Sequence, residues 1–123
     1  MELAKTLFID VDGCIFKHRG SLNDMLTSKP ELLPGVREKF NEWIMKGYQL
    51  IIATGRPESA REVTHKQLTE AGLFYHQLIM NCSIGERWVI NDTKPSNFGR
   101  PEPMRTAFGC PVERDKGLQH IVI

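Results

Sequence analysis

The chain has 123 residues, a formal net charge of +1, and 41% hydrophobic and 25% charged residues. This length suits one domain with its own core, and the composition is close to that of average globular proteins, which excludes fibrous and disordered chains. The balanced charge gives no electrostatic reason to expect nucleic acid or an acidic membrane surface as the main partner, so we expect a single domain over residues 1–123.

A strand and a helix are predicted first along the chain. Residues 6–10 form the short, continuous apolar run of a buried strand, and residues 17–33 are polar and irregular, as in a flap or long loop. A helix is then expected from about Pro34 to Lys46. Proline suits the first helical position, and Gly47 suits the left-handed residue just past a helix end.

The same pattern is repeated further on. Residues 48–53 read as a strand, and a helix follows that Pro57 opens and Gly72 closes. Two more short apolar runs, at residues 77–80 and 88–90, are candidate strands. The alternation predicts an α/β fold with a three-layer, Rossmann-like, mostly parallel sheet, helices on both of its faces and no cap domain.

The last part of the chain is harder to place. Only residues 81–86 separate the last two candidate strands, which are too few for a usual parallel crossover, so their mutual orientation stays open. Residues 93–123 are rich in proline and glycine and are expected to form a C-terminal arm. Its end, residues 118–123, suits either an edge strand or a contact with another subunit.

Polar residues follow three of the predicted strands at the point where each ends. Asp10 and Asp12 follow the first strand, residues 54–56 (Thr-Gly-Arg) the second, and Asp92 the fourth. The carboxyl ends of parallel strands meet at one edge of a sheet, where ligands bind. We therefore expect these side chains to form one site.

The residue types at these strand ends suit phosphoryl transfer. Carboxylates from separate strands are typical ligands of Mg²⁺, and we predict a magnesium site made by Asp10, Asp12 and Asp92. The hydroxyl of Thr54 can donate a hydrogen bond to a phosphate oxygen, and Gly55 lets the backbone approach it closely.

Three segments in this order resemble a known family. They are Phe-Ile-Asp-Val-Asp-Gly at 8–13, Ile-Ile-Ala-Thr-Gly-Arg at 51–56 and Val-Ile-Asn-Asp at 89–92. Together they are similar to the first, second and fourth motifs of the haloacid dehalogenase superfamily, over roughly the first three quarters of the chain. Without room for a cap domain, the chain resembles the capless members, many of which oligomerise or act on large substrates.

The resemblance implies a function and a role for each matched residue. Asp10 would be the nucleophile that forms an aspartyl-phosphate, and Asp12 the acid and then the base. Thr54 would bind the phosphate, and Asp92 would hold Mg²⁺ with the Asp10 side chain and the backbone carbonyl of Asp12. The expected activity is magnesium-dependent hydrolysis of a phosphomonoester, with a phosphorylated sugar or related small metabolite as the first candidate substrate.

The chain departs from the family pattern at the third motif, which supplies a phosphate-neutralising lysine. No lysine lies between Lys66 and Asp92. Arg87 is in the usual interval, but an extended fourth strand would put it roughly 16 Å from Asp92, at the opposite end of the sheet. Lys94 is therefore the predicted phosphate-binding cation, with Arg87 as the alternative. A second, minor departure is Cys14, where the motif more often has threonine.

Two other functions stay open at this point. The missing third-motif lysine would also suit a binding module that has lost its chemistry. A receiver domain also has an acidic cluster, a threonine and a lysine, but its phosphorylated aspartate precedes the threonine, whereas Thr54 precedes Asp92 here. A nucleotide or the end phosphate of a nucleic acid stays possible as the substrate, although the chain lacks a basic stripe.

Cysteine usage and the N-terminal apolar run bear on the compartment. The run at residues 7–11 is interrupted by Asp10 and is too short for a signal peptide or membrane span. Cys14, Cys82 and Cys110 show no paired spacing, which is typical of reduced thiols. These features predict a cytoplasmic protein, with self-association into an oligomer as one arrangement to test.

Overall fold

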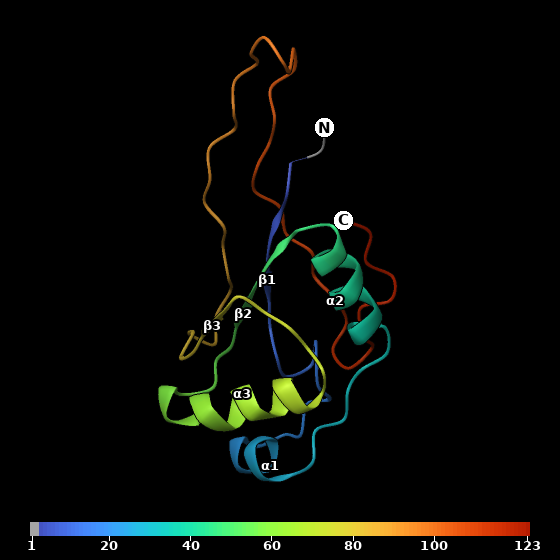
Figure 1. Ribbon diagram of the computed structural model, residues 1–123. Coiled ribbons are helices and arrows are strands. Elements are labelled where there is room, and N and C mark those ends of the chain that lie inside the picture. The colour runs from blue at the N-terminus through green and yellow to red at the C-terminus, as the bar shows by residue number, and fades with distance from the viewer. Residues whose placement is uncertain (1–2) are drawn as a thin grey trace.

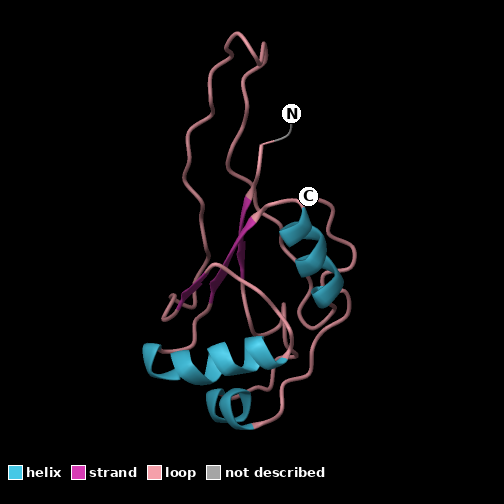
Figure 2. Ribbon diagram, in the orientation of Figure 1, coloured by secondary structure: helices cyan, strands magenta, loops and turns pink. Residues whose placement is uncertain are grey.

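Three strands and three α-helices form the regular structure of residues 3–123, which the computed structural model describes (Figures 1 and 2). A short 3₁₀ turn at Glu58–Ala60 leads into the last of the helices. The elements follow in the order β1 (Thr6–Ile9), α1 (Leu22–Thr27), α2 (Val36–Met45), β2 (Gln49–Ala53), α3 (Arg61–Glu70) and β3 (Gln77–Ile79).

The strands form one open parallel sheet in the order β1-β2-β3. In its register, Ile52 lies opposite Ile9 on one side and Leu78 on the other. The α/β prediction with a parallel sheet is thus confirmed. Because the strands are parallel, the residues that follow β1 and β2 lie at the same edge.

The helices pack against one apolar cluster. Successive strand residues point to opposite faces, so Leu50 and Ile52 share a face and Ile51 points the other way. The face opposite the cluster leaves Phe8 of β1 55% exposed. Within residues 3–123 all three α-helices contribute to the same cluster, so two layers replace the predicted three with helices on both faces. The cluster includes Ile9, Leu50, Ile52 and Leu78 from the strands, and Phe40, Trp43 and Leu68 from α2 and α3, with Leu26 of α1 packed against it.

The helix ends follow the local sequence. Gly47 and Gly72 adopt φ angles of 77° and 78° just past α2 and α3, as expected for left-handed residues that end helices. Helix α1 lies in the region predicted as a loop, and the hydroxyl of Ser21 caps it by accepting a hydrogen bond from the Asp24 N–H at 3.1 Å. No helix in the described part of the chain is long and apolar enough to cross a bilayer.

Residues 88–110 form an extended arm that projects beyond the sheet (Figure 1). The predicted fourth strand at 88–90 is wrong, because these residues do not pair with the sheet. The arm is instead a narrow antiparallel ribbon, in which Lys94 and Met104 exchange backbone hydrogen bonds of 2.8 and 2.9 Å. After the arm, the Leu118 N–H donates to the Pro34 carbonyl at 2.9 Å, which ties the C-terminal segment to the body of the chain beside α2.

Candidate functional site

A tight turn after β1 holds the two predicted catalytic carboxylates. The carbonyl of Val11 accepts hydrogen bonds from the backbone N–H groups of Ile15 at 2.8 Å and Phe16 at 3.1 Å. Val11 and Ile15 are fully buried, so the turn is anchored in the core. Asp10 and Asp12, on either side of Val11, are thus held at the carboxyl edge of the sheet, as the sequence predicts.

Asp12 is bound by a buried arginine. The Arg56 guanidinium donates to its two carboxylate oxygens at 2.9 and 2.8 Å, and Arg56 is only 4% exposed. The same guanidinium donates to Thr64 Oγ1 at 3.0 Å and to Gln67 Oε1 at 2.7 Å, both on α3. A buried charge needs such a full set of partners. The pair therefore ties the Asp12 turn to α3, a role that the sequence left open for Arg56.

Asp10 is paired with an arginine that the sequence reasoning placed elsewhere. Arg87 lies 3.2 Å from an Asp10 carboxylate oxygen and donates to the Ala53 carbonyl at 3.1 Å. The two side chains are partly exposed, at 41% for Arg87 and 35% for Asp10. The expectation that Arg87 lies at the opposite end of the sheet is wrong, because it assumed a paired fourth strand that does not form.

Thr54 and Gly55 lie at the same edge, after β2. Thr54 is buried, and its hydroxyl accepts a hydrogen bond from the Arg56 backbone N–H at 3.2 Å. The Thr54 carbonyl accepts from the Cys82 N–H at 2.9 Å, and a Cβ added at Gly55 would lie 3.4 Å from the Cys82 carbonyl oxygen. These contacts fix the backbone just after β2. The phosphate-binding role of Thr54 and Gly55 stays a prediction.

Asp92 and Lys94 lie on the arm and pair with each other. Lys94 Nζ is 2.5 Å from an Asp92 carboxylate oxygen, and this hydrogen bond lowers the pKa of Asp92 below its ordinary value. The backbone of Asp92 also accepts a hydrogen bond from the Thr106 hydroxyl across the ribbon. The structure thus gives Lys94 a partner on the arm, and Arg87 is the cation that contacts Asp10.

The predicted magnesium centre is not assembled. Among residues 3–123, no group of three or more His, Cys, Asp or Glu side chains could hold a metal ion. Each of the three proposed ligands already has a cationic partner, so the side chains as arranged do not fit the ion. The pairs are Asp10 with Arg87, Asp12 with Arg56, and Asp92 with Lys94.

Cys14 lies in the turn that carries Asp10 and Asp12, and its thiol is unreactive. Burial, and then the negative charge of Asp10, raise the pKa of its thiol to about 11. A thiol with so high a pKa stays protonated near neutral pH and is a poor nucleophile. We assign Cys14 no role in chemistry.

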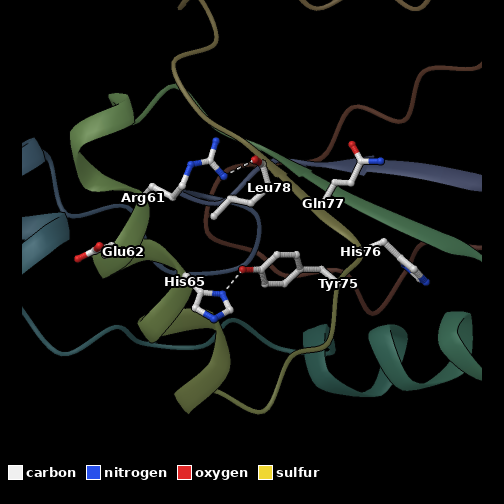
Figure 3. Close-up of a pocket in the computed structure, with 7 residues that line it drawn as sticks. All are labelled: Arg61, Glu62, His65, Tyr75, His76, Gln77 and Leu78. Atoms are coloured by element: carbon white, nitrogen blue, oxygen red, sulfur yellow. Dashed lines mark hydrogen bonds between the residues drawn. The ribbon is translucent and has the colours of Figure 1, made fainter.

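A cavity of about 340 Å³ lies between α3 and β3, apart from the two carboxylates (Figure 3). Its polar groups bond one another: Arg61 donates to the Leu78 carbonyl at 2.8 Å, and His65 Nδ1 hydrogen-bonds the Tyr75 hydroxyl. Arg61 also pairs with Glu58 at 2.6 Å. With these groups engaged, the acidic turn, and not this cavity, is the candidate site.

Comparisons with known proteins find a similar fold in chains of an RNA repair complex. No protein-family model and no curated protein matches the sequence. Two solved structures contain a chain of similar fold, one of the Pnkp1/Rnl/Hen1 complex and one of the Pnkp1/Rnl/Hen1 RNA repair complex. Each match has 25% identity, a TM-score of 0.57 and 69% of this chain covered. The chain spans less than a third of either solved chain, 30% and 28% of their lengths.

These similarities correct three expectations from the sequence. The assignment to haloacid dehalogenase phosphatases is wrong, because the similar solved chains belong to an RNA-repair assembly. For the same reason, a small phosphorylated metabolite as the partner and nucleic acid as an unlikely one are both wrong expectations. Net charge is a weak guide to the partner, because it averages over the chain and does not show where cations gather.

Proposed function

We propose that this chain is the part of an RNA-repair protein that acts on the phosphate group at an RNA end. The observation that carries the proposal is the similarity in fold to chains of the Pnkp1/Rnl/Hen1 RNA repair complex. The solvent-accessible pair of Asp10 and Arg87 supports it, because a carboxylate and a guanidinium lie together where parallel sheets bind ligands.

Arg87 is the proposed phosphate-binding group. Its guanidinium can donate two parallel hydrogen bonds to phosphate oxygens. Because Arg87 lies 3.2 Å from the Asp10 carboxylate, its positive charge also offsets the repulsion between that carboxylate and a bound phosphate. Asp10, with its side chain 35% exposed, is the proposed reacting carboxylate. The proposed reaction is hydrolysis of the terminal phosphate monoester of the RNA, with Thr54 and Gly55 forming the adjacent backbone wall.

Asp12 has a positioning role in the proposed site. Its side chain is only 12% exposed, and both of its oxygens accept hydrogen bonds from Arg56. It therefore holds the turn that presents Asp10, and its acid-base role stays a prediction from the sequence. Magnesium likewise stays a prediction, and no step is assigned to it; calorimetric titration of the chain with MgCl₂ tests it.

Phosphate release from RNA oligonucleotides tests the proposal. We expect the wild-type chain to release phosphate from an oligonucleotide that carries it at the 5′ or the 3′ end. Asp10→Asn should reduce the rate by about a hundredfold or more, the effect typical of removing a reacting acid or base. Asp24→Asn, an exposed carboxylate on α1, is the matched control and should keep the wild-type rate. Equal rates for wild type and Asp10→Asn would contradict the assignment.

A further inference from the structure

The arm exposes aromatic side chains that the body of the chain does not cover. Phe98 lies in the turn at the end of the ribbon and is fully exposed, at 108%, and Phe108 is 66% exposed. The turn is closed by hydrogen bonds between Asn97 and Arg100 at 2.7 and 3.1 Å, so Phe98 is held outward. Exposed aromatic groups on a projecting element mark a binding surface.

Cations accompany these aromatic side chains. The arm, residues 88–110, carries three cations, Lys94, Arg100 and Arg105, and two carboxylates, Asp92 and Glu102. The Arg105 guanidinium lies over the Phe108 ring, 4.5 Å from its centroid, which puts a positive charge against an aromatic ring. Because Asp92 pairs with Lys94, the excess positive charge lies in the outer part of the arm, residues 95–110, where Arg100 and Arg105 accompany Glu102.

The backbone of the ribbon argues against a protein strand as the occupant. Pro95, Pro101 and Pro103 lie within it and have no N–H to donate. A protein strand that adds to a ribbon edge depends on a regular row of donors and acceptors. Single-stranded nucleic acid needs no such row, because it binds through base stacking on aromatic rings and through its phosphates.

We propose that Phe98, Arg105 and Phe108 of the arm bind single-stranded RNA, with bases stacked on the two phenylalanine rings and phosphates paired with Arg105. This inference rests on the proposed function. The arm extends past the amino-terminal edge of the sheet (Figure 1), so the bound RNA would run back along the sheet to bring its end to Asp10 at the carboxyl edge. It adds a contact with the bases and phosphates inside the strand, away from the terminal phosphate.

Fluorescence anisotropy with the full chain tests the arm separately from the site. The probe is a labelled single-stranded RNA of about 12 nucleotides with hydroxyl groups at both ends, so that no terminal phosphate contributes. We expect Phe98→Ala and Phe108→Ala each to weaken binding by about 5- to 150-fold, the range for losing one stacked base. Phe98→Leu should weaken it as much as Phe98→Ala, because leucine is apolar but has no ring to stack.

Two further variants complete the test. Arg105→Gln should lower the slope of log affinity against log salt by about 0.7, the value for one phosphate contact of a single strand. Ile84→Ala, an equally exposed aliphatic residue just before the arm, is the matched control and should bind like the wild type. Phe98 and Ile84 are fully exposed, so their substitution should not disturb the fold, and circular dichroism checks that every variant is folded.

The outcomes separate the two proposals. If the wild-type chain does not bind this RNA at low salt, or if both phenylalanine variants bind it like the wild type, the arm proposal is overturned, and the exposed rings belong to a protein partner. Binding through the arm without phosphate release from phosphorylated RNA would instead overturn the proposed reaction and leave the arm assignment standing.

Discussion

The body of the chain and its arm use similar residues in opposite ways, and the two tryptophans show the contrast. Trp43 of α2 is 2% exposed and packs in the cluster beside the sheet, whereas Trp88 at the start of the arm is 79% exposed. Around Trp43 a helix, a turn and a strand follow closely in the chain and pack together. Around Trp88 the chain has the apolar sequence of a strand but no partner strand. An apolar run thus becomes core only where neighbouring elements cover it.

The largest expected difference between the two regions is in stability. Trp43→Ala should lower the free energy of unfolding by about 3–5 kcal/mol, because it leaves a cavity in the core. Trp88→Ala should change it by less than about 0.5 kcal/mol, as expected for an exposed site. Urea unfolding followed by circular dichroism measures both. Similar losses in the two variants would show that the arm packs against the body in solution.

A second comparison concerns the two arginines of the site. Arg56→Lys should cost about 1–3 kcal/mol, because one ammonium group cannot replace the fork that bonds Asp12, Thr64 and Gln67 together. Arg87→Lys should cost less than about 1 kcal/mol, since its pair with Asp10 is partly exposed. Denaturant titration of both variants checks this order, and a reversed order would refute the structural role given to Arg56.

The cysteines give a third comparison, between the acidic turn and the end of the arm. With a pKa of about 11, roughly 10⁻³ of Cys14 is thiolate at pH 8, so it should react far more slowly with a disulfide reagent than the exposed Cys110. Single-cysteine variants that each keep one of these thiols allow the two rates to be measured. Equal rates would show that Cys14 is not buried beside Asp10.

The raised pKa of Cys14 also makes the stability of the fold depend on pH. The folded state favours the neutral thiol, so this contribution is fully present below about pH 9 and is lost as the pH rises towards 11. Unfolding midpoints of the wild type should therefore fall over this range more than those of Cys14→Ala. If the midpoints of both proteins fall equally over this pH range, Cys14 does not contribute to the pH dependence of stability.

The smallest expected effect is on the arm. Lys94→Ala should raise the pKa of Asp92 back towards its ordinary value, because the hydrogen bond from Lys94 is what lowers it. The native pair contributes above the unfolded pKa of Asp92 and is lost as the pH falls, but full exposure makes its effect on unfolding too small to detect. NMR titration of the Asp92 carboxyl measures the shift, and an unchanged pKa would show that the pair does not persist in solution.

Local signals in the sequence predicted much of the body. The continuous apolar runs at residues 6–10 and 48–53 indicated the first two strands, and Gly47 and Gly72 indicated where the helices end. Helix α1 was missed because it is short and has no buried residue, although Ser21 followed by Asp24 was an available capping signal. These features depend on neighbouring residues, which is why sequence reasoning reached them.

The features that depend on distant contacts were not predictable in this way. The run at 88–90 suits a strand, but whether it pairs depends on the rest of the sheet. Because residues 88–90 were expected to pair with the sheet, Arg87 was placed far from Asp10, and their contact was not predicted. The role of Arg56 also requires knowing that Asp12, Thr64 and Gln67 converge on it, from two segments of the chain far apart in sequence. The sequence shows only an arginine just after a predicted strand, and its burial became visible in the structure.

Substrate preference tests the central claim most directly. The wild-type chain is given a 3′- or 5′-phosphorylated RNA oligonucleotide and a hexose phosphate, each alone and then together, and phosphate release from each is measured. We expect release from RNA that a large excess of the hexose phosphate does not inhibit. Efficient release from the hexose phosphate, with none from RNA, would contradict it.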